Sequence, residues 1–422
     1  MGTSASAATV ALNAGQQAMN IISNNFANAN TPGFKSMLAE FETLPSQTVK
    51  GASAPTASQG GTNAMQIGLG STIGAVSTSF AQGGLQTTNN TTDLAIENSE
   101  NSFFVVRDKS GATASNYLYT RAGNFSFDAD GNFVNPNGLV VQGWQADNSG
   151  NIDSSGVITD LVIPTGMRIL ANPTSEVEID ANLNSDVVIG STHVTSVNIY
   201  DSLGDRTALY VSFTKQTVNS WSWGVSVASG AATGSGTVTF NTDGSLAGIS
   251  GSAVTFNPVS GAATGQSIAL DLGTVGNSDG LTNFAAANVS VSSTSSISQD
   301  GYEAGTLSNL NINEIGEIVG LFSNGINRNI AQVALASFNN TQGLQHESGN
   351  VFSETKNSGS PAVGAASEGG RGTVAPGTLE MSNAEYTALF PEMMNIQRFF
   401  QANSKVIVAY DEMSQSAINL KR

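Results

Sequence analysis

The sequence predicts a mainly β protein with α-helical termini, built from nested, discontinuous domains. Apolar residues recur at helical spacing near both ends of the chain, whereas short runs of alternating apolar and polar residues fill its middle. Stretches rich in Gly and Ser at 46–64 and 354–378 separate the two patterns and mirror each other about the chain centre. We therefore expect both ends to return to one place, the terminal helices forming a coiled-coil inner domain and the middle forming two β-rich, barrel- or sandwich-like outer domains.

The N-terminal segment predicts a helix with one apolar face. Steps of four and three residues connect Ala8, Leu12, Gly15, Met19, Ile22 and Phe26. The opposite face carries uncharged amides, and the first charged side chain of the chain is Lys35. Because an ordinary solvated helix carries charges on its outer face, we expect both faces to contact something other than bulk water. The helix should end near Asn28 to Gly33, since Pro32 disfavours the helical conformation at the residue before it.

The C-terminal segment predicts a second helix with the same spacing. Ser382 and Glu385 are placed as in a capping box, which indicates a helix start. The apolar face that follows consists of Leu389, Met393, Ile396, Phe400, Asn403, Ile407 and Tyr410, and Ser414 and Ala417 continue the same spacing. Pro391 should kink this helix or mark the start of a straighter second part. The amide of Asn403 on the apolar face would lower stability and fix the register.

Two interpretations of these helices stay open from spacing alone. They form a coiled coil, within one chain or between subunits, and their apolar faces are self-assembly contacts. Alternatively, they are two amphipathic helices that simply cover a globular core. Limited proteolysis distinguishes the two, because only the first predicts that both ends resist cleavage in a polymer and not in the free subunit.

The β-rich middle divides into blocks. Short β-leaning runs alternate with turn residues from Asp93 onward, and a second block begins near Pro164 with three strands of period two. These strands are expected at 176–180, 194–200 and 209–213, and Asp243 with Gly244 supplies a hairpin turn. A third block spans 305–338.

We expect four parts from these blocks. A helical inner part comprises 1–30 with 380–422, and extended connector arms comprise 31–90 with 340–379. A β-rich middle domain comprises 91–165 with 289–339, and a β-rich outer domain comprises 166–288.

Composition excludes several classes of function. With 15 Lys and Arg against 32 Asp and Glu, the net charge of −17 repels phosphate backbones and anionic bilayers. We expect no nucleic-acid partner. The absence of cysteine and the presence of only two histidines exclude disulfides, thiolate catalysis and zinc sites built on these residues. The first 34 residues contain no Lys or Arg and no long apolar run, so neither a signal peptide nor membrane insertion is expected.

The local motifs do not indicate an active site. The segment Gly276 to Gly280 fits the nucleophile-elbow pattern but lacks its strand-to-helix context, so a Gly-rich surface loop is favoured. The segment Asp128 to Asn132 begins like a calcium loop but lacks the closing glutamate, and a hairpin turn explains it. His193 and His346 are expected at the surface or in packing, and Trp221 with Trp223 in a core. We therefore expect no catalytic residue, no cofactor and no metal.

Longer motifs carry a resemblance. The segment from Ile22 to Lys35, ISNNFANANTPGFK, is similar to the N-terminal signature of bacterial flagellar rod and hook proteins, and Gln397 to Val406 is similar to their C-terminal signature. The blocks between resemble the hook proteins of this axial family: Asp93–Ile96, Phe103–Val106, Tyr119–Phe125, Asn137–Gly143, Tyr200–Gly204, Ser298–Tyr302, Ala336–Phe338 and Gln342–Leu344. Phe26, Phe399 and Pro391 depart from the family pattern, which leaves the start of the straight C-terminal helix in question.

This resemblance implies a structural subunit of the flagellar hook. Such subunits leave the cell unfolded through the flagellar type III system and assemble into a curved, flexible tube that couples the rod to the filament and transmits torque. The resemblance places the terminal helices in the innermost layer and the β domains outside them. It implies as partners the chain itself, the rod and hook-associated junction proteins, the hook cap and the export apparatus.

Two alternatives stay open. A distal rod or hook-associated axial protein would share both terminal signatures, and the large block at 166–288 favours the hook over the rod. A β-rich extracellular adhesin or hydrolase would not need the terminal apolar faces and would keep its activity as a monomer without them.

Overall fold

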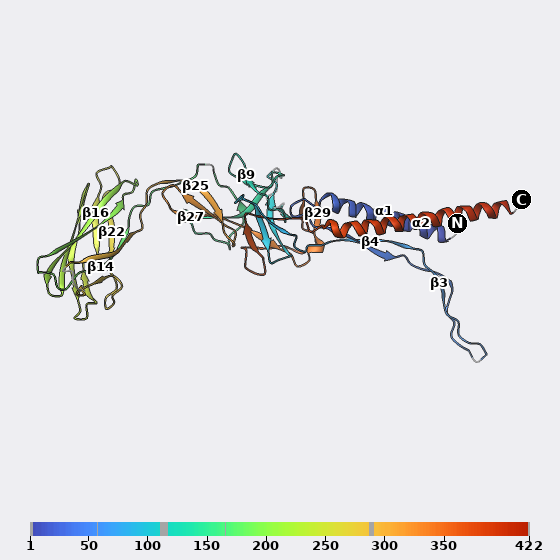
Figure 1. Ribbon diagram of the computed structural model, residues 1–422, viewed down its shortest axis with the longest axis horizontal. Coiled ribbons are helices and arrows are strands. Elements are labelled where there is room, and N and C mark those ends of the chain that lie inside the picture. The colour runs from blue at the N-terminus through green and yellow to red at the C-terminus, as the bar shows by residue number, and fades with distance from the viewer. Residues whose placement is uncertain (1–2, 57, 110–116, 165, 287–290, 421–422) are drawn as a thin grey trace. The chain divides into compact units, whose positions relative to one another are not determined.

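The computed structural model describes residues 3–56, 58–109, 117–164, 166–286 and 291–420, and it confirms a mainly β chain with helices near its termini (Figure 1). The chain forms two compact units. Unit 1 comprises 1–165, 310–319 and 329–422, and unit 2 comprises 166–309 and 320–328. Because each unit takes residues from separate parts of the chain, both are discontinuous.

Unit 1 holds both long helices, α1 (Thr3–Ala27) and α2 (Tyr386–Asn419), and the short 3-10 helix η1 (Thr341–Gly343). Its strands are β1 (Met37–Thr43), β2 (Gln47–Lys50), β3 (Met65–Ile67), β4 (Ser71–Thr78), β5 (Leu85–Thr87), β6 (Leu94–Glu97), β7 (Ser102–Arg107), β8 (Tyr117–Thr120), β9 (Ser126–Phe127), β10 (Phe133–Val134), β11 (Val140–Gln145), β12 (Thr159–Asp160), β28 (Leu335–Ser337), β29 (Gln345–Glu347), β30 (Val351–Ser353), β31 (Ala362–Gly364), β32 (Thr373–Pro376) and β33 (Thr378–Glu380).

Unit 2 is almost entirely β. Its strands are β13 (Arg168–Ile169), β14 (Glu176–Asn182), β15 (Thr192–Tyr200), β16 (Arg206–Thr217), β17 (Ser220–Val227), β18 (Ala231–Thr233), β19 (Ser235–Phe240), β20 (Leu246–Ser250), β21 (Ala253–Asn257), β22 (Gln266–Asp271), β23 (Leu281–Thr282) and β24 (Ser293–Gln299). Three further strands, β25 (Gly305–Ile312), β26 (Glu317–Phe322) and β27 (Asn327–Val333), each contain residues of both units.

The core of unit 1 is aromatic. Strand β7 pairs with β8, β11 and β28, and its residues 102–106 are all buried. Phe103 lies at the centre, with the rings of Phe80, Phe338 and Phe352 at 5.5, 5.9 and 5.8 Å between centroids. These edge-to-face contacts bury large apolar area and hold three distant segments of the chain on one sheet.

Strands β1 and β4 of unit 1 pair antiparallel and continue into a hairpin of β2 and β3. Residues 45–56 and 58–68 of this hairpin are all exposed. The N-terminal Gly- and Ser-rich stretch is therefore part of an exposed hairpin.

Unit 2 is a sandwich of two sheets. One sheet has the order β15-β16-β17-β19-β20, and the other has the order β18-β21-β22-β14-β23 with β24 beside β14. A single apolar cluster takes residues from both sheets and includes Trp221 and Trp223, which confirms that the two rings share the buried face of one strand. The three strands predicted with period two are β14, β15 and β16, and the predicted hairpin turn at Gly244 joins β19 to β20.

The predicted capping box is wrong. Helix α2 begins at Tyr386 with Glu385 as its N-cap, and no side chain caps it. The reason is the neighbouring Asn383, whose Oδ1 accepts from the Ser36 backbone N–H at 2.7 Å and whose Nδ2 donates to the Ser79 carbonyl at 2.8 Å. These bonds tie the chain to unit 1 before the helix can begin.

Pro391 lies inside α2 and does not mark its start. Because it has no N–H, only the carbonyl of Thr387 loses its helical partner, and Thr387 is exposed to water. No helix of the described residues is long and apolar enough to span a bilayer.

Candidate assembly site

The two helices from opposite ends of the chain lie side by side and antiparallel (Figure 1). At one end of the pair the ring of Phe26 meets those of Tyr386 and Phe390 edge-on, at 4.9 and 5.2 Å between centroids. Further along, Gly15 lies against Phe399, where an added Cβ would come within 3.3 Å of the ring. The end of α1 therefore lies beside the start of α2, and earlier residues of α1 lie beside later residues of α2.

The predicted residues of α2 occupy its least exposed face. Leu389 is buried, and the others are half-buried among mostly exposed neighbours: Met393, Ile396, Phe400, Asn403, Ile407 and Tyr410. On α1, Ile22 is buried and Leu12, Met19 and Phe26 are half-buried. Ile22, Leu389, Phe26, Met393 and Ile396 form one apolar cluster with Phe34. Within one chain, these residues join the two helices to each other.

Sequence reasoning missed a second buried face on α1, made of small residues. Ala11, Ala14 and Ala18 are buried, and α1 contacts β1 and β4 as well as α2. Alanine allows the helix axis to come close to the strands. The recurrence of alanine at steps of three and four was the available signal.

Asn25 is the polar end of this face. Its Oδ1 accepts from the Met37 N–H at 2.9 Å, and its Nδ2 donates to the Met37 carbonyl at 2.6 Å. The buried amide thus pairs with the first residue of β1 as a neighbouring strand would, which fixes where the chain leaves the helix.

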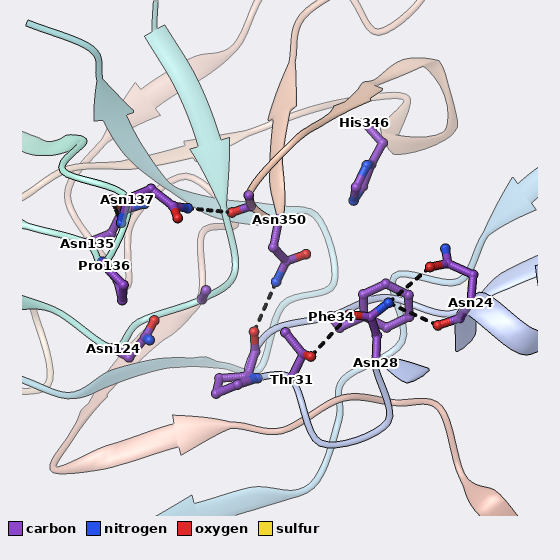
Figure 2. A pocket seen from close by; sticks show the side chains of 13 residues that line it. Asn24, Asn28, Thr31, Phe34, Asn124, Asn135, Pro136, Asn137, His346 and Asn350 are labelled. Carbon is purple, nitrogen blue, oxygen red and sulfur yellow. Dashed lines mark hydrogen bonds between the residues drawn. The ribbon is translucent and has the colours of Figure 1, made fainter. Parts of the chain in front are cut away.

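A hollow of about 370 Å³ lies beside the end of α1 (Figure 2). Uncharged amides line much of it, and Asn350 donates to the Pro32 carbonyl at 3.0 Å while Asn137 donates to the Gly349 carbonyl at 2.9 Å. His346 is the single imidazole among the lining residues, and burial lowers its pKa more than Glu347 raises it. No acid–base pair is present among the residues that line this hollow.

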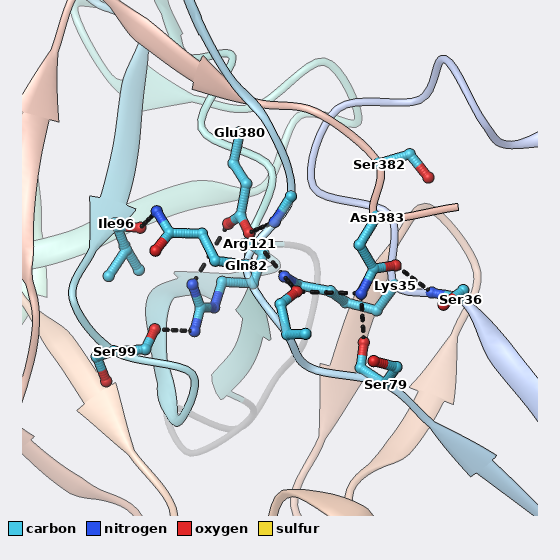
Figure 3. Close-up of polar contacts among 12 residues, drawn as sticks. Lys35, Ser36, Ser79, Gln82, Ile96, Ser99, Arg121, Glu380, Ser382 and Asn383 are labelled. Atoms are coloured by element: carbon cyan, nitrogen blue, oxygen red, sulfur yellow. Dashed lines mark hydrogen bonds and ion pairs between the residues drawn. The ribbon is translucent and has the colours of Figure 1, made fainter. Parts of the chain in front are cut away.

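A buried ion network lies at the base of the helix pair (Figure 3). Glu380 accepts from Lys35 at 2.7 Å and from Arg121 at 3.3 Å, and all three side chains are at most 1% exposed. The Gly83 N–H also donates to Glu380 at 2.9 Å, and Lys35 donates to the Ala81 carbonyl at 2.7 Å. Burial lowers the pKa of both Lys35 and Arg121, and Glu380 opposes that effect.

This network joins three distant segments. Lys35 follows α1, Arg121 follows β8, and Glu380 ends β33 shortly before α2. Because a buried charge without its partner is strongly destabilising, the network fixes the end of α1 and the start of α2 to the β part of unit 1. The sequence motifs contained Lys35 and Arg121, but nothing in them indicated that Glu380 would meet both.

The other motifs take structural positions. The segment 128–132 is the hairpin turn between β9 and β10, as predicted, with Asp128 Oδ1 accepting from the Asp130 and Asn132 N–H groups. The segment 276–280 lies in the loop between β22 and β23. His193 Nε2 lies 2.9 Å from the hydroxyl of Thr294, and no cluster of three or more metal-binding side chains occurs among the described residues.

Four family models match the chain. The description "Flagella basal body rod protein" matches residues 6–35 and "Flagellar basal body rod FlgEFG protein C-terminal" matches 375–420. Between them, "Flagellar hook protein FlgE/F/G D1 domain" matches 95–195 and "Flagellar basal body protein FlaE D2 domain" matches 171–302.

Two similar proteins cover nearly the whole chain. It is 38% identical over 440 residues to the flagellar hook protein FlgE of Borreliella burgdorferi, with 96% of each chain covered. It is 36% identical to the flagellar hook protein FlgE of Treponema pallidum, covering 96% of this chain and 97% of that one. The crystal structure of Helicobacter pylori flagellar hook protein FlgE2 matches in fold with a TM-score of 0.55 at 16% identity, covering 70% of this chain and 100% of that chain.

Proposed function

The chain belongs to the flagellar hook protein family, and we propose that it is the structural subunit of a flagellar hook, which self-assembles into a curved, flexible tube between rod and filament. The observation that carries this proposal is the helix pair. Two apolar helices from opposite ends of the chain lie together, and the outer face of α1 has no charged residue. A helix pair of this kind is built to contact other protein on more than one side.

We also propose how the subunit is exported, where it is located and which proteins it contacts. It is exported unfolded by the flagellar type III system and is located in the hook outside the cell. Its partners are further copies of itself, the rod and hook-associated junction proteins, the hook cap and the export apparatus. Family membership supports a polymeric axial component, and the more specific partners follow from the hook role.

We propose no catalytic activity. The polar side chains that line the hollow beside α1 are asparagine amides, one threonine and one histidine, and the ion network is closed around Glu380. An adhesin or hydrolase would instead act as a monomer after removal of both helices.

A rod or hook-associated protein is the second candidate, because two of the matching models describe rod proteins at the chain ends. The match of a D2 domain at 171–302 favours the hook. Labelling the chain in cells separates the two, since a rod protein lies in the cell envelope and a hook subunit lies outside.

The test uses a charge in the helix pair. Ile396→Asp strands a carboxylate in the cluster with Ile22 and Leu389, at a cost of several kcal/mol, so assembly should fail while the β units stay folded. Asn395→Asp introduces the same charge at an exposed neighbour and should assemble normally. Electron microscopy under polymerising conditions detects tubes, and circular dichroism detects β folding. Normal tubes from Ile396→Asp would contradict a role for the helix pair in assembly.

A further inference from the structure

Helix α2 carries a second apolar stripe beside the one that contacts α1. Phe399, Val406 and Met413 of α2 and its C-cap residue Leu420 follow one another at intervals of seven residues, with Ala402, Ala409 and Ser416 between them. Residues seven apart lie on one face of a helix, so these side chains form a continuous line. No charged side chain interrupts the line from 399 to 420.

This second stripe is covered at one end only. Phe399 meets the ring of Phe41 at 6.4 Å between centroids, and Val406 lines a hollow with Ala8 and Ala11. Exposure then rises along the stripe, from 36% at Phe399 and 46% at Val406 to 64% at Met413 and 87% at Leu420.

Exposure rises along the stripe because α2, with 34 residues, is longer than α1, with 25. Both helices rise about 1.5 Å per residue, so the described start of α1 at Thr3 lies roughly level with residue 411 of the antiparallel α2. From 411 to 420 every residue except the half-buried Ser414 is exposed. An uncharged apolar stripe in water is unfavourable, which indicates that other protein covers it.

The same chain offers a receiving surface. A groove of about 460 Å³ lies between the helices, and Gly15, Met19, Ile396 and Phe400 line it. Its lining also includes Gln16 and Asn20, and none of its lining residues is charged.

The groove and the second stripe lie on different flanks of α2. Phe399 and the other stripe residues each come one position before Phe400 or a residue a multiple of seven after it, and they lie on the flank of α2 toward β1 and β4. Gln397 and Gln401 border the groove on the other flank. A helix cannot place both flanks against one neighbour. A contact between two different surfaces of identical subunits is heterologous, so it produces a ring or an open helical polymer rather than a closed dimer.

We propose that the second stripe of α2, centred on Met413 and Leu420, inserts into the α1–α2 groove of another copy of this chain. The proposal rests on the proposed function as a polymer subunit and assigns its assembly contact. The first stripe then holds the two helices of one chain together, and the second joins one chain to the next. Both surfaces are uncharged, so the contact leaves no buried ion unpaired.

Matched variants test the stripe. Met413→Glu should raise the critical concentration for polymerisation at least tenfold, while Gln415→Glu, an exposed position on the opposite side of α2, should leave it within twofold of the unmodified chain. Circular dichroism melting checks that both variants fold. Equal assembly of the two variants would overturn the proposal but not the polymer function, whereas failure of the unmodified chain to polymerise would contradict the proposed function itself.

Cross-linking tests the groove, and the absence of cysteine from the chain gives a clean background. Gln16→Cys places a thiol at the groove, and Met413→Cys places one on the stripe. Under mild oxidation, polymers that mix the two variants should yield disulfide-linked dimers, and polymers of either variant alone should not. Dimers from Met413→Cys alone, or no dimers from the mixture, would overturn the assignment.

Discussion

Glu380 is the residue on which the position of the helix pair depends. Its carboxylate is the shared partner of Lys35 and Arg121, and the guanidinium of Arg121 also lies 5.3 Å from the centre of the Phe103 ring. The network therefore connects the helix ends to the aromatic core of unit 1. Its two buried cations share this carboxylate, and Glu100, the other acidic side chain that acts on both, has a weaker effect.

We predict that Glu380→Gln lowers the free energy of unfolding by about 3–5 kcal/mol, because it removes the carboxylate that both buried cations contact. Glu385→Gln is the matched control, since Glu385 is exposed and its side chain makes no capping hydrogen bond, and its effect should stay within about 0.5 kcal/mol. Urea denaturation followed by fluorescence measures both. A loss for Glu380→Gln no larger than that of the control would show that the network is not a structural anchor.

The sequence alone could not have identified this network. Its members are separated by as many as 345 residues, and they meet only because β33, β8 and the segment after α1 fold into one unit. Local patterns report which face of an element is apolar, and they contain no information on which distant charge that face will meet.

At the scale of elements, prediction succeeded where periodicity was strong. The apolar face of α2 from Leu389 to Tyr410 is its covered face, because one face of a long helix must contact one surface. The predicted start of α2 was wrong because Asn383 makes tertiary hydrogen bonds that no local sequence motif indicates. On α1, the spacing of the large apolar residues predicted one face only, whereas Ala14 and Ala18, which are 2% and 0% exposed, lie on another.

The alanine face of α1 leads to a prediction for Ala18, which is 0% exposed. Ala18→Leu inserts three carbons where the helix meets its neighbours, and overpacking of this kind costs about 1–3 kcal/mol. The helix pair should loosen, so trypsin and chymotrypsin should remove the termini faster from the free subunit. Ala27→Leu, at an exposed position of the same helix, should leave the cleavage rate unchanged. An unchanged rate for Ala18→Leu would mean that α1 does not pack closely on β1, β4 and α2.

At the scale of the whole molecule, the fold class followed from the contrast between helical ends and a β-rich middle. The expected outer domain at 166–288 stays a prediction, and the structure suggests sharper limits for testing it. Asn172 and Tyr302 exchange two backbone hydrogen bonds of 2.9 and 3.0 Å. The segment between them contains every residue of the unit 2 core cluster, and none of the residues of the two clusters in unit 1.

We therefore predict that residues 173–301 can be replaced by a two-residue Asn-Gly turn joining Asn172 to Tyr302. Such a turn closes a pair of residues that exchange both backbone hydrogen bonds, and the deletion removes one complete core without opening another. The shortened chain should fold and polymerise through its helices, but its polymers should be straight, because the deleted domain is expected to set the spacing between neighbours at the tube surface. Thermal melting and electron microscopy measure the two outcomes. Curved tubes from the shortened chain would separate curvature from this domain, and a chain that cannot fold would show that unit 1 depends on it.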